Sequence, residues 1–372
     1  MSDVRRIPFS IETFLKRSWP LLAIGIVLVF GLAGVLFHYA IAGQGRVKTV
    51  STPVVIEAPS STTPETVLIP RKLDGMPVLP QEASLQPFAV MVENSPDARP
   101  LSGISAANIV IEAPVEGGIT RFMTVFDATT TVDQIGPVRS ARPYFVELAD
   151  GLNAVYAHVG GSPEALQDIH AFSNFRDLDQ FYNAKYFWRS AKRDAPHNVY
   201  TRMDVLREAT AAKAWSVQPF KGWAFLDGAA TSSVRGNVNA IAVPYGGTFN
   251  VTWKYDPETN MYTRFQAGAI QKDSDGAVVR VSNVVLLLSE QQVLDDIGRL
   301  RVRTTGSGKA RLFHDGRVFE GTWHRQTGGW LSFEGIDGAD MTFEPGITWL
   351  SMVTSPAMFS AGNGSGATST AL

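Results

Sequence analysis

An uninterrupted apolar segment near the N-terminus constrains this chain more than any other feature. From Leu21 to Phe37 every residue is apolar or Gly, and the wider stretch Pro20–Ala42 adds only His38 and Tyr39 as polar residues. This length reaches the roughly 20 residues that a helix needs to cross a bilayer. A buried core helix would carry a polar face, which the segment lacks. We therefore expect residues 20–42 to form a transmembrane anchor.

The charges beside this segment predict its orientation. Four Lys or Arg residues lie within residues 1–19, whereas Arg46 and Lys48 are the two that follow closely. The positive-inside rule then keeps residues 1–19 in the cytoplasm and exports the rest, as a single-pass membrane protein. The competing interpretation is a signal peptide cleaved after Ala42, because Ala40-Ile41-Ala42 fits a cleavage site. The apolar run exceeds the roughly 7–15 residues of a signal-peptide core, which favours the retained anchor.

Composition excludes several classes of protein. The formal net charge is -2, so the chain lacks the basic footprint of a nucleic-acid binder, and we expect no nucleic-acid partner. The 372 residues include no Cys, which excludes disulfides, thiol catalysis, thiolate metal sites and lipid attachment through a Cys. The hydrophobic content of 45% supplies enough apolar material for one large core or two smaller ones.

The residue pattern divides the exported region into parts. Residues 43–87 are rich in Ser, Thr and Pro without a lasting period, which predicts a flexible stalk, and residues 356–372 predict a flexible tail. In residues 88–220 strand-like and helix-like segments alternate, whereas residues 221–355 resemble short strands joined by turns. The predicted fold class is α+β, with a mixed α/β N-terminal subdomain and a mostly β C-terminal subdomain, preceded by one transmembrane helix. Whether the two subdomains share a sheet stays open.

Periodicity and capping residues predict individual elements. Apolar patterns predict strands at Ala89–Glu93, Ile109–Ala113, Ile119–Asp127 and Ala154–Val159. Helices are expected near Ala141–Asp150, from a Ser162 cap to about Ile169, and from Thr201 to about Trp215. Residues Gly306–Lys309 lack the upstream spacing of a phosphate-binding loop and are predicted to form a turn.

Several motifs in a fixed order resemble a known family. They are Val92-Glu93-Asn94, Glu116-Gly117-Gly118-Ile119-Thr120-Arg121-Phe122, Ile135-Gly136-Pro137-Val138-Arg139-Ser140-Ala141-Arg142, His158-Val159-Gly160-Gly161-Ser162-Pro163-Glu164-Ala165 and Ala195-Pro196-His197-Asn198-Val199-Tyr200-Thr201. The chain resembles the YerB family of bacterial envelope proteins, also called the DUF3048 family, over roughly Phe88 to Val353. The resemblance implies a bacterial, extracytoplasmic protein with the family's N-terminal and C-terminal domains, and it implies no activity. Many family members look like lipoproteins held by a lipidated Cys, so this chain departs from them in having none.

The motifs are rich in groups that are costly to bury alone. These are Glu112, Glu116, Arg121, Arg139, Arg142, His158, Arg193, His197, Asn198 and Tyr200. If they converge, the guanidinium groups suit a carboxylate or phosphate ligand, such as a peptidoglycan stem peptide or an anionic wall polymer. The equal alternative is a structural network in which the Glu and Arg side chains pair with one another.

Other chemistry has weaker support in the sequence. Glu112 and Glu116 can be paired carboxylates of a hydrolase, but their spacing fixes no separation. His158 and His197 are zinc ligands by type, yet no close His spacing supports a site, so we predict no metal and no cofactor. His158 ends an apolar strand and is expected to be a satisfied, buried His. The aromatic run is expected to be core: Phe172, Phe175, Phe181, Tyr182, Tyr186, Phe187 and Trp188.

The sequence thus predicts a membrane-anchored, extracytoplasmic module that binds a cell-wall component or an envelope protein partner. The alternative is an envelope hydrolase that uses Glu112, Glu116, His158 or His197. A His–carboxylate pair open to a cleft favours the enzyme, whereas Arg and Glu side chains sealed against one another favour a structural network.

Overall fold

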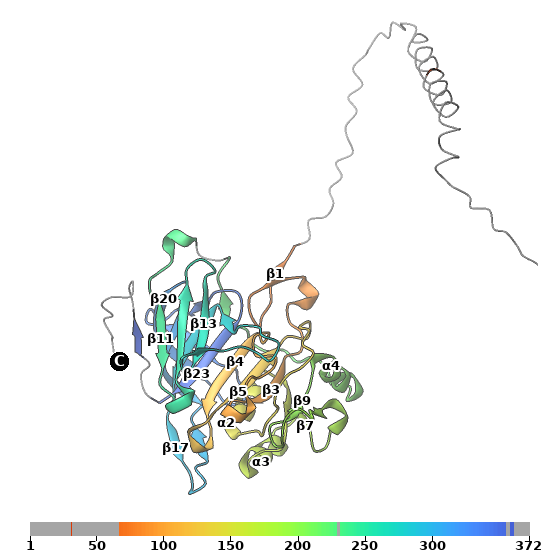
Figure 1. Ribbon diagram of the computed structural model, residues 1–372. Coiled ribbons are helices and arrows are strands. Elements are labelled where there is room, and N and C mark those ends of the chain that lie inside the picture. The colour runs from red at the N-terminus through yellow and green to blue at the C-terminus, as the bar shows by residue number, and fades with distance from the viewer. Residues whose placement is uncertain (1–30, 32–66, 229–230, 355–357, 361–372) are drawn as a thin grey trace, which may run out of the picture. The chain divides into compact units, whose positions relative to one another are not determined.

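A ten-stranded β-sheet organises the computed structural model, which describes residues 31, 67–228, 231–354 and 358–360. Figure 1 shows that N-terminal strands, in orange and yellow, lie beside C-terminal strands, in blue. The order across the sheet is β21 (Ser332–Gly335), β20 (Arg317–Arg325), β19 (Gly306–His314), β16 (Asn283–Leu288), β23 (Thr348–Val353), β4 (Ile109–Pro114), β5 (Thr120–Phe126), β3 (Phe88–Glu93), β6 (Val155–His158) and β7 (Arg176–Asp179). Strands β16, β23 and β4 run parallel to one another, as do β3, β6 and β7.

Smaller sheets and short helices surround the ten strands. The second sheet contains β14 (Ala269–Ile270), β13 (Met261–Gln266), β12 (Val251–Asp256), β11 (Ala240–Val243), β24 (Met358–Ser360) and β15 (Arg280–Val281). The strand pairs are β1 (Ile69–Pro70) with β2 (Pro77–Val78), β8 (Trp188–Arg189) with β9 (Val199–Tyr200), β10 (Ala224–Phe225) with β22 (Thr342–Phe343), and β17 (Gln291–Val293) with β18 (Leu300–Val302). The 3-10 helices are Pro80–Glu82, Pro96–Ala98, Glu116–Gly118, Ala184–Tyr186, Ser232–Val234 and Gly247–Phe249.

Side chains alternate across the large sheet and build a core on each face. Val90, Val92 and Phe122 belong to a buried cluster with Trp253 of β12 in the second sheet. Their neighbours along the strands, such as Met91 and Met123, belong to a second cluster that includes residues of α2 (Pro143–Gly151). Both faces of the central strands are therefore buried, which explains the continuous apolar runs in the sequence.

The three predicted helices of the N-terminal half are present. α2 begins with Pro143 in its first turn, and α3 (Pro163–Ala171) begins at Ser162, whose side chain accepts a hydrogen bond from Ala165 N at 3.3 Å. The predicted Ser162 cap is confirmed. The third helix is α4 (Met203–Ala212). It starts two residues later than the predicted Thr201, because Thr201 bridges to Ile135 instead.

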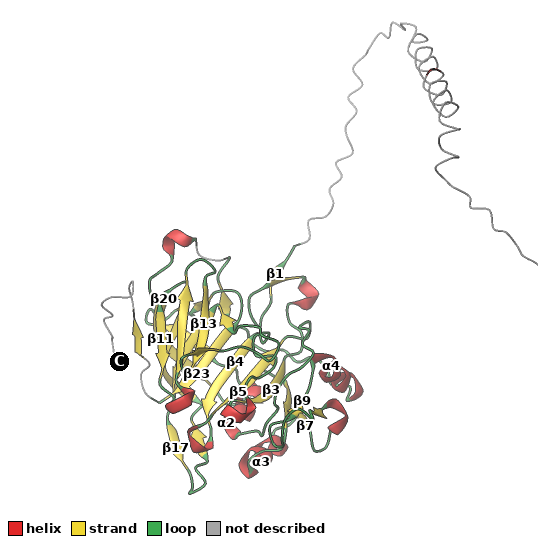
Figure 2. Ribbon diagram, viewed as in Figure 1, coloured by secondary structure: helices red, strands yellow, loops and turns green. Residues whose placement is uncertain are grey.

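The predicted fold class is wrong. Strands dominate the described residues as a whole, as Figure 2 shows in yellow, and α2, α3 and α4, which all precede residue 220, are the α-helices among them. The mixed α/β N-terminal subdomain was overestimated because β7, β8 and β9 were missed. β7 has the sequence Arg-Asp-Leu-Asp and lies at the sheet edge, so it carries no apolar run to mark it. Residues Gly306–Lys309, predicted as a turn, begin β19.

The predicted transmembrane helix is not supported. No helix in the part of the chain that the structure describes is long and apolar enough to span a membrane. The predicted segment 20–42 lies outside the described residues, apart from Gly31, as does most of the predicted stalk.

Candidate functional site

The carboxyl ends of β3, β6 and β7 meet at one edge of the large sheet. Beyond their paired residues, β3 and β6 separate, and the segment around Arg139 enters between them: Arg139 N donates to Met91 O at 2.9 Å, and Val159 N donates to Arg139 O at 3.1 Å. Ligands of open α/β sheets bind in such a crevice outside the carboxyl ends of parallel strands. Side chains that reach this carboxyl edge are therefore candidates for ligand binding.

Glu93, the last residue of β3, has three partners. Its Oε2 lies 2.9 Å from His197 Nδ1, its Oε1 lies 3.3 Å from Arg139 Nε, and Ser95 Oγ donates to Oε1 at 2.9 Å. The Glu93 side chain is buried, whereas those of Arg139 and His197 are 24% and 23% exposed. Glu93 thus orients a cation and an imidazole that both reach solvent.

A hollow of about 530 Å³, here called the edge pocket, lies beside this group. Its lining includes Arg139, Gly160, Phe181, Tyr182, Arg189 and Pro196. Phe181 and Tyr182 are 66% and 83% exposed, so the prediction that they belong to the core is wrong, whereas Tyr186 and Phe187 are buried as predicted. The exposed rings provide an apolar surface beside two guanidinium groups.

The acidic side chains of the edge pocket each have a partner in the protein. Asp179 Oδ1 accepts from Gly160 N at 2.9 Å and from Phe181 N at 3.1 Å. Asp177 Oδ1 lies 2.8 Å from His158 Nε2, and His158 Nδ1 lies 2.7 Å from Gly160 O. His158 is fully buried, so the prediction of a satisfied structural His is confirmed.

Arg189 keeps donors for a ligand. Its Nη1 donates to Asn198 Oδ1 at 2.8 Å, and among the described residues it forms no ion pair. Asn198, a predicted site residue, therefore positions an arginine of the pocket. Sequence reasoning missed Glu93 and Arg189 as site residues, although Glu93 lies in a quoted motif and Arg189 directly follows Trp188 of the aromatic run.

A second hollow, of about 910 Å³, lies next to His197 and is lined also by Lys192, Arg193 and Tyr200. Arg193 donates to the backbone oxygens of Asp97 at 3.2 Å and Pro100 at 2.6 Å, so it also braces the loop after β3. Burial raises the pKa of the Tyr200 hydroxyl, because the phenolate form is desolvated.

Glu112 lies away from this edge pocket, in a sealed pair. Its two oxygens accept from Arg264 Nη2 at 2.9 and 2.7 Å, and both residues are fully buried. Thr120 Oγ1 donates to the same carboxylate at 2.8 Å and Trp349 Nε1 at 3.1 Å. Arg264 also stacks on the Trp349 ring at 4.4 Å. This pair joins β4 to β13, and its Arg partner was missed because the two lie 152 residues apart.

Glu116 and Arg142 form a second pair, of the predicted kind. Arg142 Nε and Nη2 each donate to a different Glu116 oxygen at 2.6 Å. Burial alone would raise the pKa of Glu116, but the hydrogen bonds and charge of Arg142 outweigh it and lower the pKa. Arg121 is buried and donates to Ser140 O at 2.7 Å. Burial, and then the neighbouring Arg142, lower the pKa of Arg121 to about 10.

The predicted site residues therefore divide into groups. Arg139 and His197 converge on Glu93, and Asn198 and Tyr200 support the surrounding pockets, whereas Glu112 and Glu116 each pair with an arginine elsewhere. His158 and His197 hold different carboxylates, Asp177 and Glu93. Neither belongs to the group of potential metal ligands found among the described residues.

Comparison with known proteins identifies the family. The model of the N-terminal domain of "Protein of unknown function (DUF3048)" matches residues 73–216, and the model of its C-terminal domain matches residues 241–350. The chain belongs to the DUF3048 family. The resemblance predicted from the motifs is confirmed.

YerB of Bacillus subtilis is similar to this DUF3048 protein both in sequence and in structure. The protein named "Putative lipoprotein YerB", from strain 168, is 34% identical over 288 residues, which are 76% of this chain and 85% of that protein. The crystal structure of the YerB protein is similar with a TM-score of 0.68 at 32% identity, and the match covers 76% of this chain and 96% of that chain. The family domains thus span both sides of residue 220.

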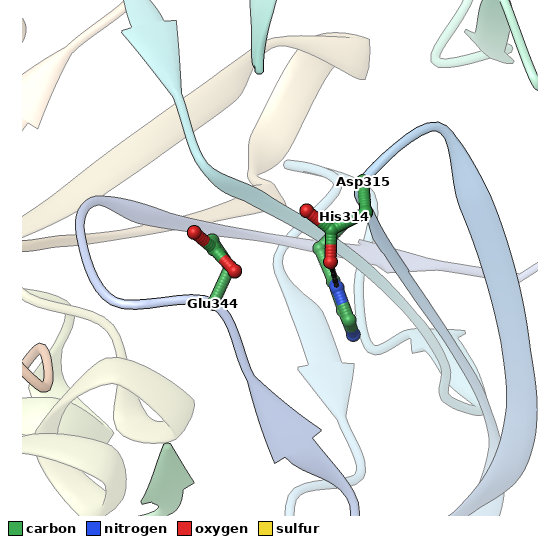
Figure 3. Close-up of side chains that lie close together, drawn as sticks. All are labelled: His314, Asp315 and Glu344. Atoms are coloured by element: carbon green, nitrogen blue, oxygen red, sulfur yellow. Dashed lines mark hydrogen bonds and ion pairs between the residues drawn. The ribbon is translucent and has the colours of Figure 1, made fainter. Parts of the chain in front are cut away.

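The C-terminal half of this DUF3048 protein contains a feature that the sequence prediction missed. His314, Asp315 and Glu344 place one potential ligand atom each within 4.8 Å of one another, and Figure 3 shows the three side chains together. The sequence contains a hint, since Asp315-Gly316 is typical of a hairpin turn and His314 precedes it directly. Glu344 is distant in sequence and follows β22. Burial and the nearby Asp315 raise the pKa of Glu344 to about 7.

Proposed function

We propose that this chain is a membrane-associated protein of the bacterial cell envelope whose edge pocket binds an anionic group of a cell-wall component. Its Bacillus relative bears the name of a lipoprotein, which supports an envelope location. This chain contains no Cys, so a lipidated Cys does not attach it.

The observation that carries the binding proposal is the charge arrangement of the edge pocket. Asp179 already accepts hydrogen bonds from the protein and Asp177 lies 2.8 Å from His158 Nε2, whereas Arg139 and Arg189 present donors toward solvent. Guanidinium groups recognise carboxylate and phosphate oxygens in planar geometry. A ligand with an anionic group thus finds donors that the protein leaves available.

The exposed rings favour a ligand with a sugar or peptide portion. Phe181 and Tyr182 stand in solvent at the rim of the edge pocket, where an aromatic face gives contact area and the Tyr hydroxyl a polar contact. Wall fragments combine an anionic group with sugars and short peptides, so both parts of the pocket suit them.

The test is retention of the purified full chain on isolated cell wall. Arg139→Ala with Arg189→Ala removes the pocket cations, and Arg301→Ala removes an exposed arginine of β18 as the matched control. We expect the wild type and the control to be retained at low salt and released at high salt, and the double variant to lose retention by about tenfold or more. Equal retention of the double variant would overturn the proposal.

A hydrolase remains the second candidate because one His–carboxylate pair is open. Glu93 holds His197 Nδ1 at 2.9 Å, and His197 lines the hollow of about 910 Å³, so its Nε2 is available as a general base. Glu112 and Glu116 no longer support this candidate, since each carboxylate is paired with an arginine. Release of soluble wall fragments by the wild type, abolished in His197→Gln, would favour the enzyme over the binding module.

A further inference from the structure

The cluster of His314, Asp315 and Glu344 lies outside the edge pocket and is independent of the proposed function. His314 is the last residue of β19, Asp315 follows it in the hairpin turn, and Glu344 lies between β22 and β23. Figure 3 shows the Glu344 side chain projecting from its own loop toward the hairpin that carries the other two. Two segments of sequence, about 30 residues apart, therefore meet around one small volume.

We propose that His314, Asp315 and Glu344 bind a divalent cation of the zinc–manganese class. The imidazole nitrogen and two carboxylates are ligand types that Zn²⁺ and Mn²⁺ accept. Their ligand atoms lie within 4.8 Å of one another. Ligand bonds of about 2.0–2.2 Å place ligand atoms about 3 to 3.5 Å apart, so Glu344 would move closer and His314 Nδ1 and Asp315 Oδ2, now 2.7 Å apart, would separate slightly.

An unsatisfied oxygen points to the ligand. Glu344 is only 5% exposed, and among the described residues its Oε2 has no hydrogen-bond donor. Burial of a carboxylate oxygen without a donor is costly, so native proteins pair such groups or let them coordinate a metal. Asp315 differs, because its Oδ1 accepts from Asn260 Nδ2 and its Oδ2 faces His314 Nδ1, both at 2.7 Å. A cation beside Glu344 supplies the missing partner.

The surrounding residues hold the ligands in place, as around known metal sites. Both backbone groups of Glu344 bond to the Asn283 side chain, at 2.9 Å through N and 2.7 Å through O. Asn260, which donates to Asp315, is itself fixed by Tyr255 through a hydrogen bond of 2.7 Å. His314 stacks on the Phe319 ring at 4.4 Å. Each proposed ligand is thus oriented by a contact that does not depend on the cation.

Charge and access are compatible with a cation. Asp315 and Glu344 bring two carboxylates, and Arg235 is the nearby arginine whose charge acts on both. His314 and Asp315 also line a hollow of about 830 Å³, which gives an entry path and room for water or another ligand in the remaining coordination positions. Mg²⁺ and Ca²⁺ prefer all-oxygen sites with more ligands, so they fit this set less well.

The test uses the full chain, without a His tag, after removal of metals with a chelator. Zn²⁺, Mn²⁺ and Mg²⁺ are titrated by calorimetry, and bound metal is counted after dialysis. Glu344→Gln removes the unsatisfied carboxylate, and Asp315→Asn keeps a residue that tolerates the positive φ of 53° at this turn. Glu334→Gln is the control, because Glu334 belongs to an exposed pair with His324 at 3.8 Å. Far-UV circular dichroism confirms that each variant is folded.

We expect one equivalent of Zn²⁺ or Mn²⁺ per wild-type chain, with Mg²⁺ weaker. Glu344→Gln and Asp315→Asn should each weaken binding by about tenfold or more, and Glu334→Gln should leave it unchanged. Absence of saturable binding to the wild type would overturn the proposal. Unchanged affinity in folded Glu344→Gln and Asp315→Asn, or loss of affinity in Glu334→Gln, would also overturn it, because the metal would then bind at the surface.

Discussion

Two glutamates of the same sheet, Glu112 in β4 and Glu93 in β3, each meet an arginine, but their surroundings differ. Glu112 and its partner Arg264 are fully buried. Glu93 is buried as well, yet its partners Arg139 and His197 are 24% and 23% exposed. The same residue types therefore form a closed pair in the core and an open group at the carboxyl edge.

This difference separates a structural role from a binding role. A charge inside the core is stabilised only by its protein partners, because no water molecule can take the place of a partner that is removed. At the edge, solvent screens the charges, so their mutual contribution to stability is small and their free donors can serve a ligand. Variants at the two places should accordingly affect different measurements.

The largest effect is expected from Glu112→Gln. The substitution leaves the Arg264 guanidinium buried without a carboxylate, and breaking a buried pair in this way costs about 3–5 kcal/mol. Urea unfolding followed by circular dichroism measures the loss. A change below about 1 kcal/mol would contradict the view that this pair is sealed.

A double variant sharpens this result. Glu112→Gln with Arg264→Met removes both charges, and apolar replacement of a whole buried pair is often close to neutral. We expect the double variant to recover a large part of the stability that Glu112→Gln loses. Equal instability of both variants would show that packing around Trp349, rather than the ion pair, dominates here.

A smaller, pH-dependent effect is expected for Glu116→Gln. The lowered pKa of Glu116 means that the folded state releases this proton more readily than the unfolded state, so the pair with Arg142 contributes stability above the ordinary carboxyl pKa of about 4.5. That contribution, about 1 kcal/mol for a half-buried pair, is lost as the pH falls through the lowered pKa. Unfolding curves of wild type and variant should converge at low pH, and a constant difference would contradict this assignment.

The smallest effect on stability is expected at the rim of the edge pocket. Phe181→Ala and Tyr182→Ala remove rings that are largely exposed, so the free energy of unfolding should change by no more than about 0.5 kcal/mol. Wall retention should nevertheless fall severalfold if the rings contact the ligand as proposed. A marked loss of stability without loss of retention would reverse the assigned roles.

Local signals in the sequence predicted much of this fold. The apolar runs of β3, β4, β5 and β6 and the Ser162 cap were visible because each depends on neighbouring residues. The ten-stranded sheet was not, because it pairs β4 with β23, more than 200 residues later. The polar edge strand β7 carried no apolar pattern, and the balance of helix and strand was misjudged as a result.

The candidate sites, like the fold, were predictable from the sequence only in part. Arg139 and His197 were identified by residue type, but the partner that joins them, Glu93, depends on the carboxyl edge of a sheet that was not foreseen. Arg264 and Glu344 were missed for the same reason, since each acts on a residue brought close only by tertiary folding. Residue type thus predicted which side chains are costly to bury alone. The topology of the sheet decides which of them are sealed in the core and which reach solvent.

The most direct test of this distinction follows the Nε–Hε signals of arginine side chains by NMR while soluble anionic wall fragments are added. The edge pocket predicts shifts for Arg139 and Arg189 that saturate with ligand, whereas the signal of Arg264 stays in place. Shifts at Arg264, or no shift at Arg139 and Arg189 at saturating ligand, would contradict the account.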